Sequence, residues 1–180
     1  IIPGPPEKYL AIGPTIRAIG EVFSVKLNGE DKWGNPSDQC DVTFYPKAKL
    51  PLARLPESIS LADGEFAVSI DNLVAHEAGD FTIDFYDDSG ALVFSTNPIR
   101  IEETPKSRHF WGDIHGQSEE TIGTGSAEDY FKFARDRAFV DVIGHQGNDF
   151  QITTEFWKHL DDLCAKFNQD GIFITIPGYD

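Results

Sequence analysis

Methionine, paired cysteines and long apolar runs are scarce in this sequence, and each shortage excludes a class of protein. Its 180 residues contain no Met and only two Cys, Cys40 and Cys164, which lie far apart and outside any C-x-x-C motif. This spacing excludes a disulfide framework and a cysteine-built zinc knuckle, so we expect two buried thiols. No apolar run approaches the length of a membrane span and no signal-peptide pattern is visible, so we expect no membrane span.

Positive charge is also in short supply. Fifteen Lys and Arg stand against 30 Asp and Glu, which gives a formal net charge of -15. Phosphate backbones and anionic lipid surfaces are repelled by such a chain. We therefore expect neither a nucleic-acid partner nor a membrane partner.

Apolar side chains are plentiful enough for packed cores. Hydrophobic residues make up 40% of the chain and 14 residues are Phe, which excludes a disordered chain. The length suits one ordinary domain, or one small domain and part of a second. The absence of Met favours a trimmed or mature piece of a longer product.

Residues 1–104 have the period of β-strands. Apolar residues alternate with polar ones between about residues 22 and 101, and Gly-, Asn- and Asp-rich turns separate the runs. One inward face per strand is typical of two packed antiparallel sheets. We predict an all-β, immunoglobulin-like sandwich domain over residues 1–104.

Residues 105–180 have a different period. After a short Pro-containing stretch, strands are predicted at 109–114, 140–144 and 172–176, and helices at 126–138 and 154–168. Crossover helices require parallel strands, so this α/β domain is interpreted as the start of a parallel (β/α) barrel. A complete barrel takes roughly 250 residues. We therefore expect it to be incomplete in this chain, with its remainder in a longer chain or another subunit.

Polar side chains gather where each predicted parallel strand ends. Asp113 and His115 belong to the first end, His145 and Asp149 to the second, and Asp180 to the third. The carboxyl ends of parallel strands lie on one side of a sheet, so we expect these side chains to converge. A lone histidine after a strand is more often a hydrogen-bonded cap, but the nearby carboxylates favour a functional cluster.

Imidazole and carboxylate without thiolate suit a catalytic zinc, manganese or iron ion. Such a metal turns a bound water into a nucleophile near neutral pH. We expect one to three ions held by His115, His145 and Asp180. Asp149 is expected to act as a further ligand or base, and Asp113 to orient His115 by a hydrogen bond.

Three segments also resemble a known family; they are residues 109–118, 123–130 and 134–136. They are similar to the domain-of-unknown-function family 3604, which is related to the polymerase-and-histidinol-phosphatase (PHP) hydrolases. The resemblance covers roughly residues 108–180. It implies a distorted barrel, a centre of two or three metals, and phosphoester or phosphonate hydrolysis.

The resemblance also implies roles for single residues. His115 matches the first histidine of the family's His-x-His metal motif, while Gln117 stands in place of the second, as a weaker ligand. The family's second motif falls near His145, although an ungapped match puts Asn148 on its histidine. Asp180 matches a metal-binding carboxylate at the end of a Pro-Gly-Tyr-Glu segment.

The sequence thus predicts a metal-dependent hydrolase of the PHP or amidohydrolase-like type, acting on a small-molecule ester. Two alternatives stay open. One is a non-catalytic protein whose sandwich binds a carbohydrate or a protein beside a degenerate barrel, and the other is an amide or lactone hydrolase that uses the same metal site.

Overall fold

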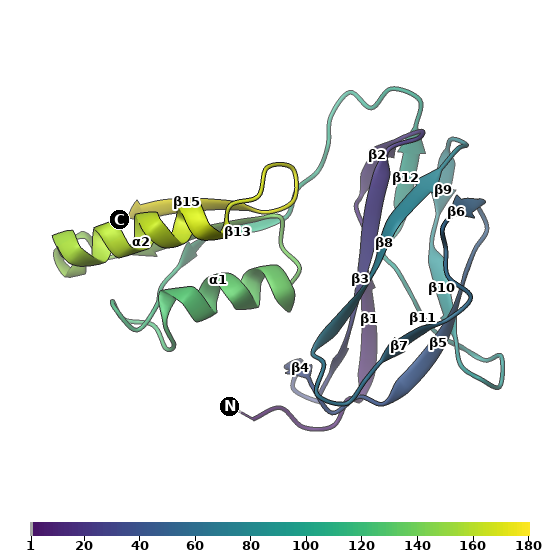
Figure 1. The fold of residues 1–180 in the computed structure, drawn as a ribbon, viewed down its shortest axis with the longest axis horizontal. Coiled ribbons are helices and arrows are strands. Elements are labelled where there is room, and N and C mark those ends of the chain that lie inside the picture. Colours follow the sequence, from purple (N-terminus) through teal and green to yellow (C-terminus); the bar gives the residue numbers. More distant parts are fainter. Residues whose placement is uncertain (1) are drawn as a thin grey trace. The chain divides into compact units, whose positions relative to one another are not determined.

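The computed structural model of the chain describes residues 2–180. It divides into two compact units, of which the first ends at His109 and the second runs Phe110–Asp180 (Figure 1). The expected boundary between residues 104 and 105 lies within the first unit. No helix of the described residues is both long enough and apolar enough to cross a membrane.

In the described part of the first unit, residues 2–109, all the regular elements are strands. One sheet contains β1 (Lys8–Ile12), β3 (Val22–Glu30), β4 (Pro36–Ser37), β6 (Leu52–Ala53) and β8 (Ala67–Ala75). A second sheet contains β5 (Val42–Ala48), β7 (Ile59–Leu61), β10 (Ile83–Tyr86) and β11 (Leu92–Ser95). A third contains β2 (Ile16–Ala18), β9 (Gly79–Phe81) and β12 (Ile99–Glu102). Most neighbours are antiparallel, while β2 and β12 are parallel.

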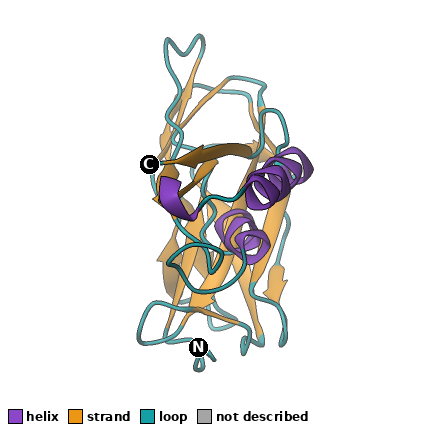
Figure 2. Cartoon of the chain, turned by 90° about the vertical axis from the view of Figure 1, so that its left-hand side faces the viewer, coloured by secondary structure: helices purple, strands orange, loops and turns teal. Residues whose placement is uncertain are grey.

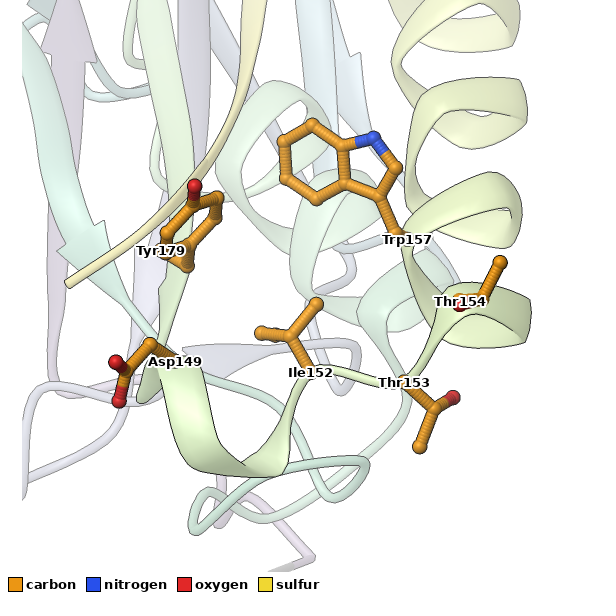
Figure 3. Close-up of a pocket in the computed structure, with 6 residues that line it drawn as sticks. All are labelled: Asp149, Ile152, Thr153, Thr154, Trp157 and Tyr179. Carbon is orange, nitrogen blue, oxygen red and sulfur yellow. The ribbon is translucent and has the colours of Figure 1, made fainter.

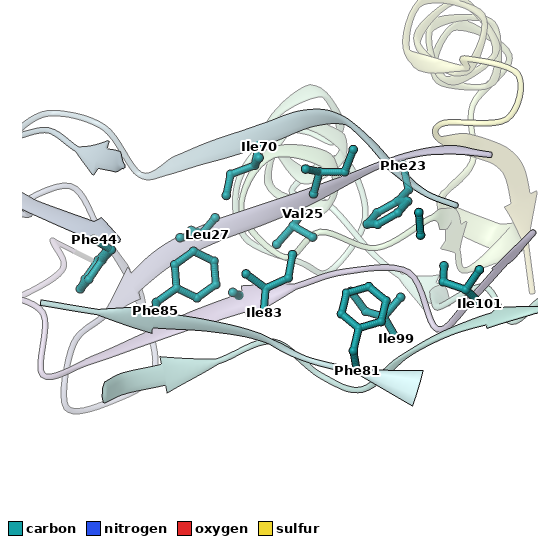
Figure 4. Packing of buried hydrophobic residues seen from close by; sticks show 13 residues of the cluster. Phe23, Val25, Leu27, Phe44, Ile70, Phe81, Ile83, Phe85, Ile99 and Ile101 are labelled. Carbon is teal, nitrogen blue, oxygen red and sulfur yellow. The ribbon is translucent and has the colours of Figure 1, made fainter. Parts of the chain in front are cut away.

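Alternating side chains from these sheets form one apolar core. In β3, Phe23, Val25 and Leu27 are buried, as the strand period predicts. Figure 4 shows them facing buried side chains of β10 and β12, among them Phe85 and Ile99. Two layers of strands therefore pack face to face as a β-sandwich.

The second unit is a three-stranded sheet with helices. Its elements are β13 (Gly112–Gly116), α1 (Ala127–Asp136), β14 (Val142–Gly147), a short 3-10 helix (Asp149–Gln151), α2 (Thr154–Phe167) and β15 (Ile174–Tyr179). All three strands are parallel and β14 lies in the middle. Among residues 2–180 the helices, which are purple in Figure 2, all belong to this unit.

Both helices begin where the sequence predicts. The Ser126 side chain accepts a hydrogen bond from the backbone N–H of Asp129, and Thr153 caps α2 through the N–H of Phe156. Such hydroxyls satisfy N–H groups that have no partner within the helix. The buried faces of the two helices pack on the sheet around Phe131 and other apolar residues of the second core.

The predicted fold class is wrong in its second half. Among residues 2–180 the strands form no (β/α) barrel, and the chain is mostly β with two α-helices. The physical reason is that three parallel strands make only a narrow open sheet. Closing a barrel requires about eight strands at a matched tilt. The sandwich, by contrast, is formed as predicted. The second unit is an open sheet and not a TIM-like barrel.

Candidate functional site

One face of β14 is covered by helices and the other is exposed. The predicted site residues are divided between these two faces. The ring of His145 contacts Tyr130 of α1 and Phe156 of α2, at centroid distances of 6.2 Å and 5.4 Å. His145 therefore faces the helices and is fully buried. Side chains alternate along a strand, so the next residue, Gln146, lies on the opposite face.

His115 and Asp180 meet on the face of Gln146. The Nδ1 atom of His115 lies 3.2 Å from Oε1 of Gln146, and its Nε2 atom lies 3.6 Å from Oδ2 of Asp180. The side chain of His115 is 67% exposed and that of Asp180 is 42% exposed. The expected convergence of strand ends therefore includes residues 115 and 180 but leaves out residue 145.

A β-bulge in β13 aims His115 at Gln146. The pairing of β13 with β14 shifts register between Asp113 and Gly116, so two residues of β13 lie opposite one residue of β14. The side chain of Asp113 accepts a hydrogen bond from the backbone N–H of His115 at 2.9 Å. The partner that orients the imidazole ring in this structure is Gln146, which the sequence analysis did not single out.

On the helix side, His145 belongs to a buried polar group. Its Nε2 atom lies 2.8 Å from Oγ of Ser118, while Nδ1 is buried without a hydrogen-bond partner among the described residues. Burial lowers the pKa of His145, and the nearby Glu120 carboxylate opposes this effect. The hydroxyl of Tyr130 donates to the carbonyl oxygen of Gly144 at 3.1 Å, and burial raises its pKa to about 12. A neutral imidazole held inside the core is a structural group.

The predicted metal centre does not fit these residues. Among residues 2–180, no three or more His, Cys, Asp or Glu side chains are grouped so that they could hold a metal ion. His145 lies on the wrong face, and the Oε1 atom of Gln117 is buried without a hydrogen-bond partner in the described chain. The expectation of a zinc, manganese or iron ion held by His115, His145, Asp180 and Gln117 is therefore corrected. Asn148, the alternative to His145, donates instead to the side chain of Gln151 at 2.8 Å.

Asp149 lies in a pocket beside this cluster. The pocket has a volume of about 550 Å³ and is lined by Asp149, Ile152, Thr153, Thr154, Trp157 and Tyr179. In Figure 3 the two aromatic rings lie above Ile152, with the carboxylate at one side and the threonines at the other. The rings of Trp157 and Tyr179 meet edge to face, with centroids 5.6 Å apart.

Sequence reasoning missed this pocket. Neither Trp157 nor Tyr179 is among the predicted site residues. Yet Trp157 is 36% exposed and Tyr179 is 58% exposed. The available signal was the position of Trp157, one turn into a helix that starts just after the end of β14.

The pocket leaves several polar groups for a ligand. Oδ1 of Asp149 accepts from the backbone N–H of Phe150, whereas Oδ2 makes no hydrogen bond within the described residues. The indole N–H of Trp157 and the hydroxyls of Thr154 and Tyr179 likewise make none there. Donors and acceptors thus surround an apolar floor.

Comparisons with known proteins show distant relatives. No family model matches the chain, so its resemblance to family 3604 stays a prediction. Proteins of Chlamydia trachomatis, Chlamydia muridarum and Chlamydia pneumoniae, each described as an uncharacterized protein, are 25%, 24% and 23% identical to it. Each match covers 87% of this chain and 26% of the relative, so the chain spans about a quarter of their length.

Two solved structures align with part of the chain. The D0-D1 domain of intimin aligns with a TM-score of 0.38 and 7% identity, over 51% of this chain and 45% of that one. The fibronectin type-III domain of human fibronectin type III domain containing protein 3 aligns with a TM-score of 0.22 and 16% identity, over 58% of this chain and 94% of that one.

Proposed function

We propose that the chain is a binding protein whose second unit holds a small, neutral, hydroxyl-bearing molecule, such as a sugar, in the pocket between β15 and α2. The observation that carries this proposal is the pocket itself. Two exposed aromatic rings, one carboxylate oxygen and two hydroxyls line it, and these polar groups have no partners within the described residues.

The volume and shape of the pocket fit a small ligand. Pockets for small molecules usually measure about 300–1,000 Å³ and combine apolar walls with a few polar groups. The C–H face of a sugar ring can pack on Trp157 or Tyr179, since aromatic rings present a large flat apolar surface. Its hydroxyls can donate to Asp149 and accept from Thr154 or from the indole N–H.

The charges of the pocket favour a neutral ligand over an ionic one. Its lining contains one carboxylate and no Lys, Arg or His, which disfavours an anion. The N-terminal end of α2 begins at Thr154 and carries partial positive charge, which disfavours a cation beside it. A neutral molecule with hydroxyl groups experiences neither repulsion.

A ligand-observed NMR screen tests the proposal. Neutral mono- and disaccharides are incubated with the chain, and magnetisation transfer from protein to ligand is measured. We expect transfer for at least one sugar, and Trp157→Ala should remove it because the ring surface is lost. Asp149→Asn, which keeps the shape of the side chain but removes its charge, should weaken binding severalfold.

Trp33→Ala is the matched control. Trp33 is 77% exposed and belongs to the sandwich, between β3 and β4, so this variant removes an exposed indole without changing the pocket. Sugar binding that survives Trp157→Ala but is lost in Trp33→Ala would place recognition in the sandwich and contradict the proposal. Binding of no sugar by the intact chain would contradict it as well.

A further inference from the structure

The sheet of the second unit has one covered face and one bare face. Ile143 belongs to the core formed with α1 and α2, and the Thr175 hydroxyl donates to the carbonyl oxygen of Cys164 in α2, so these side chains face the helices. The alternate residues of β14 and β15 face the other way, among them Val142 and Ile176.

The bare face carries one apolar side chain or more on each strand. These are Ile114, Val142, Ile174 and Ile176, and the polar side chains of His115, Gln146 and Asp180 lie on the same face toward the carboxyl ends of the strands. Ile114 is 59% exposed and Ile176 is 45% exposed, while Val142 and Ile174 are partly exposed. Ile114 lies on this face because its Cα and Cβ atoms are the nearest neighbours of the position that a side chain on Gly144 would take. Gly144 is itself buried by Ile114, so the glycine allows β13 and β14 to approach closely at this point.

Parallel sheets are rarely left open to water. Their strands are usually covered on both faces, and their sequences are apolar on both faces for that reason. Here only the helix side is covered among residues 2–180. The isoleucines on the other side therefore lose the favourable burial that such side chains obtain in a complete sheet, about 25 cal/mol for each Å².

The size of the bare face indicates what can cover it. Three strands about 4.8 Å apart, each about six residues of 3.3 Å long, present roughly 300 Å². A stable complex between separate proteins buries about 800 Å² on each partner. A second copy or a free partner would therefore bind this face weakly. A segment tethered to the same polypeptide needs no such area, because tethering raises its effective concentration to about the millimolar range.

The distant relatives contain additional chain. The region they share with this protein makes up 26% of their length, so most of each relative lies outside it. We propose that the bare face of β13, β14 and β15 is an intramolecular docking surface, covered by an apolar face of a further segment of the same polypeptide. Residues 110–180 contain thirteen Asp and Glu against five Lys and Arg, so basic residues are expected to flank that apolar face.

Cysteine labelling tests this inference. Ile176→Cys and, separately, Ile114→Cys are introduced into residues 1–180 and into the full polypeptide that the gene encodes. The two native cysteines are free and buried, so they give a low background. We expect rapid reaction with a thiol reagent in residues 1–180, and labelling at least tenfold slower in the full polypeptide at both positions.

Trp33→Cys is the control, because this exposed sandwich position should react equally fast in both proteins. Equal labelling of Ile176→Cys in both proteins would overturn the inference, as would a gene that encodes no more than these 180 residues. Slow labelling already in residues 1–180 would overturn it too. Concentration-dependent protection there would indicate a second copy as the occupant, and concentration-independent protection would indicate the sandwich unit.

Discussion

His145 and Gln146 are neighbours in the sequence, yet their side chains lie on opposite faces of one sheet. His145 contacts rings of both helices, whereas Gln146 reaches His115 on the open face. The predicted second parallel strand ends at Gly144, but β14 continues to Gly147. His145 is therefore a residue within a strand, where alternation decides which face it takes. Two adjacent residues of β14 therefore have different roles: His145 is buried against the helices, and Gln146 belongs to the exposed polar cluster.

Acidification should destabilise the protein through His145. Burial lowers the pKa of His145 in the folded state, so below the unfolded value of about 6.5 the unfolded chain binds the proton more readily. Stability is therefore fully present above about pH 6.5 and is lost as the pH falls below it, at most by about 1.4 kcal/mol per pH unit for one proton. Urea unfolding at pH 7.5 and pH 5.5 measures this loss.

His145→Gln is the matched variant, because glutamine can still hydrogen-bond to Ser118 but does not titrate in this range. The other four histidines are the same in both proteins, so their contributions cancel in the comparison. We expect a smaller loss of stability on acidification in the variant. An equal loss in both proteins would show that His145 is not the group responsible.

At the scale of elements, the helices were predicted well and the strands of the second unit less well. Apolar side chains at spacings of three and four and the hydroxyl of Ser126 predict the helices, and the structure adds Thr153 as the cap of α2. The three parallel strands begin and end two or three residues later than predicted, and β14 and β15 continue through Gly144, Gly147 and Gly178. Close backbone packing, which a sequence does not display, explains such glycines.

Removing the cap of α1 should weaken the second unit. Ser126→Ala leaves the backbone N–H of Asp129 without its acceptor, and such a loss costs about 1 kcal/mol of unfolding free energy. Ser126→Asp, which supplies another acceptor, should retain most of the stability. Denaturant midpoints of the three proteins measure the effect, and an unchanged midpoint for Ser126→Ala would show that the cap contributes nothing.

The candidate site could be predicted only in part. The rule that parallel strand ends converge correctly brought His115 close to Asp180. This rule could not predict the bulge in β13, the face on which His145 lies, or the pocket of Trp157 and Tyr179. These features depend on strand register and on helix packing. Cys40 and Cys164 were correctly predicted as buried thiols.

At the scale of the whole molecule, the chain has two cores that share no residue. One lies in the sandwich and contains Phe85, and the other lies in the second unit and contains Leu160. Residues 105–180, predicted to be the incomplete start of a (β/α) barrel, form an open three-stranded parallel sheet instead. The strand alternation of the first half, in contrast, is a local signal, so the sandwich was predictable from it.

A substitution that destabilises one core should leave the stability of the other core unchanged. Leu160→Ala and Phe85→Ala each remove a fully buried side chain, at an expected cost of about 2–5 kcal/mol and about 3–5 kcal/mol respectively. Hydrogen–deuterium exchange resolved along the chain should show lost protection only in Phe110–Asp180 for Leu160→Ala, and only before residue 110 for Phe85→Ala. Loss of protection in both units from either variant would contradict two separate cores.

The binding proposal is tested most directly by the three tryptophan indole signals in a ¹H–¹⁵N correlation spectrum. The chain contains only Trp33, Trp111 and Trp157, so each signal can be assigned by a single Trp→Phe variant. On titration with a sugar that the screen identifies, the Trp157 signal should shift and saturate while the Trp33 and Trp111 signals stay in place. A Trp157 signal that does not move, while the Trp33 signal does, would contradict the account.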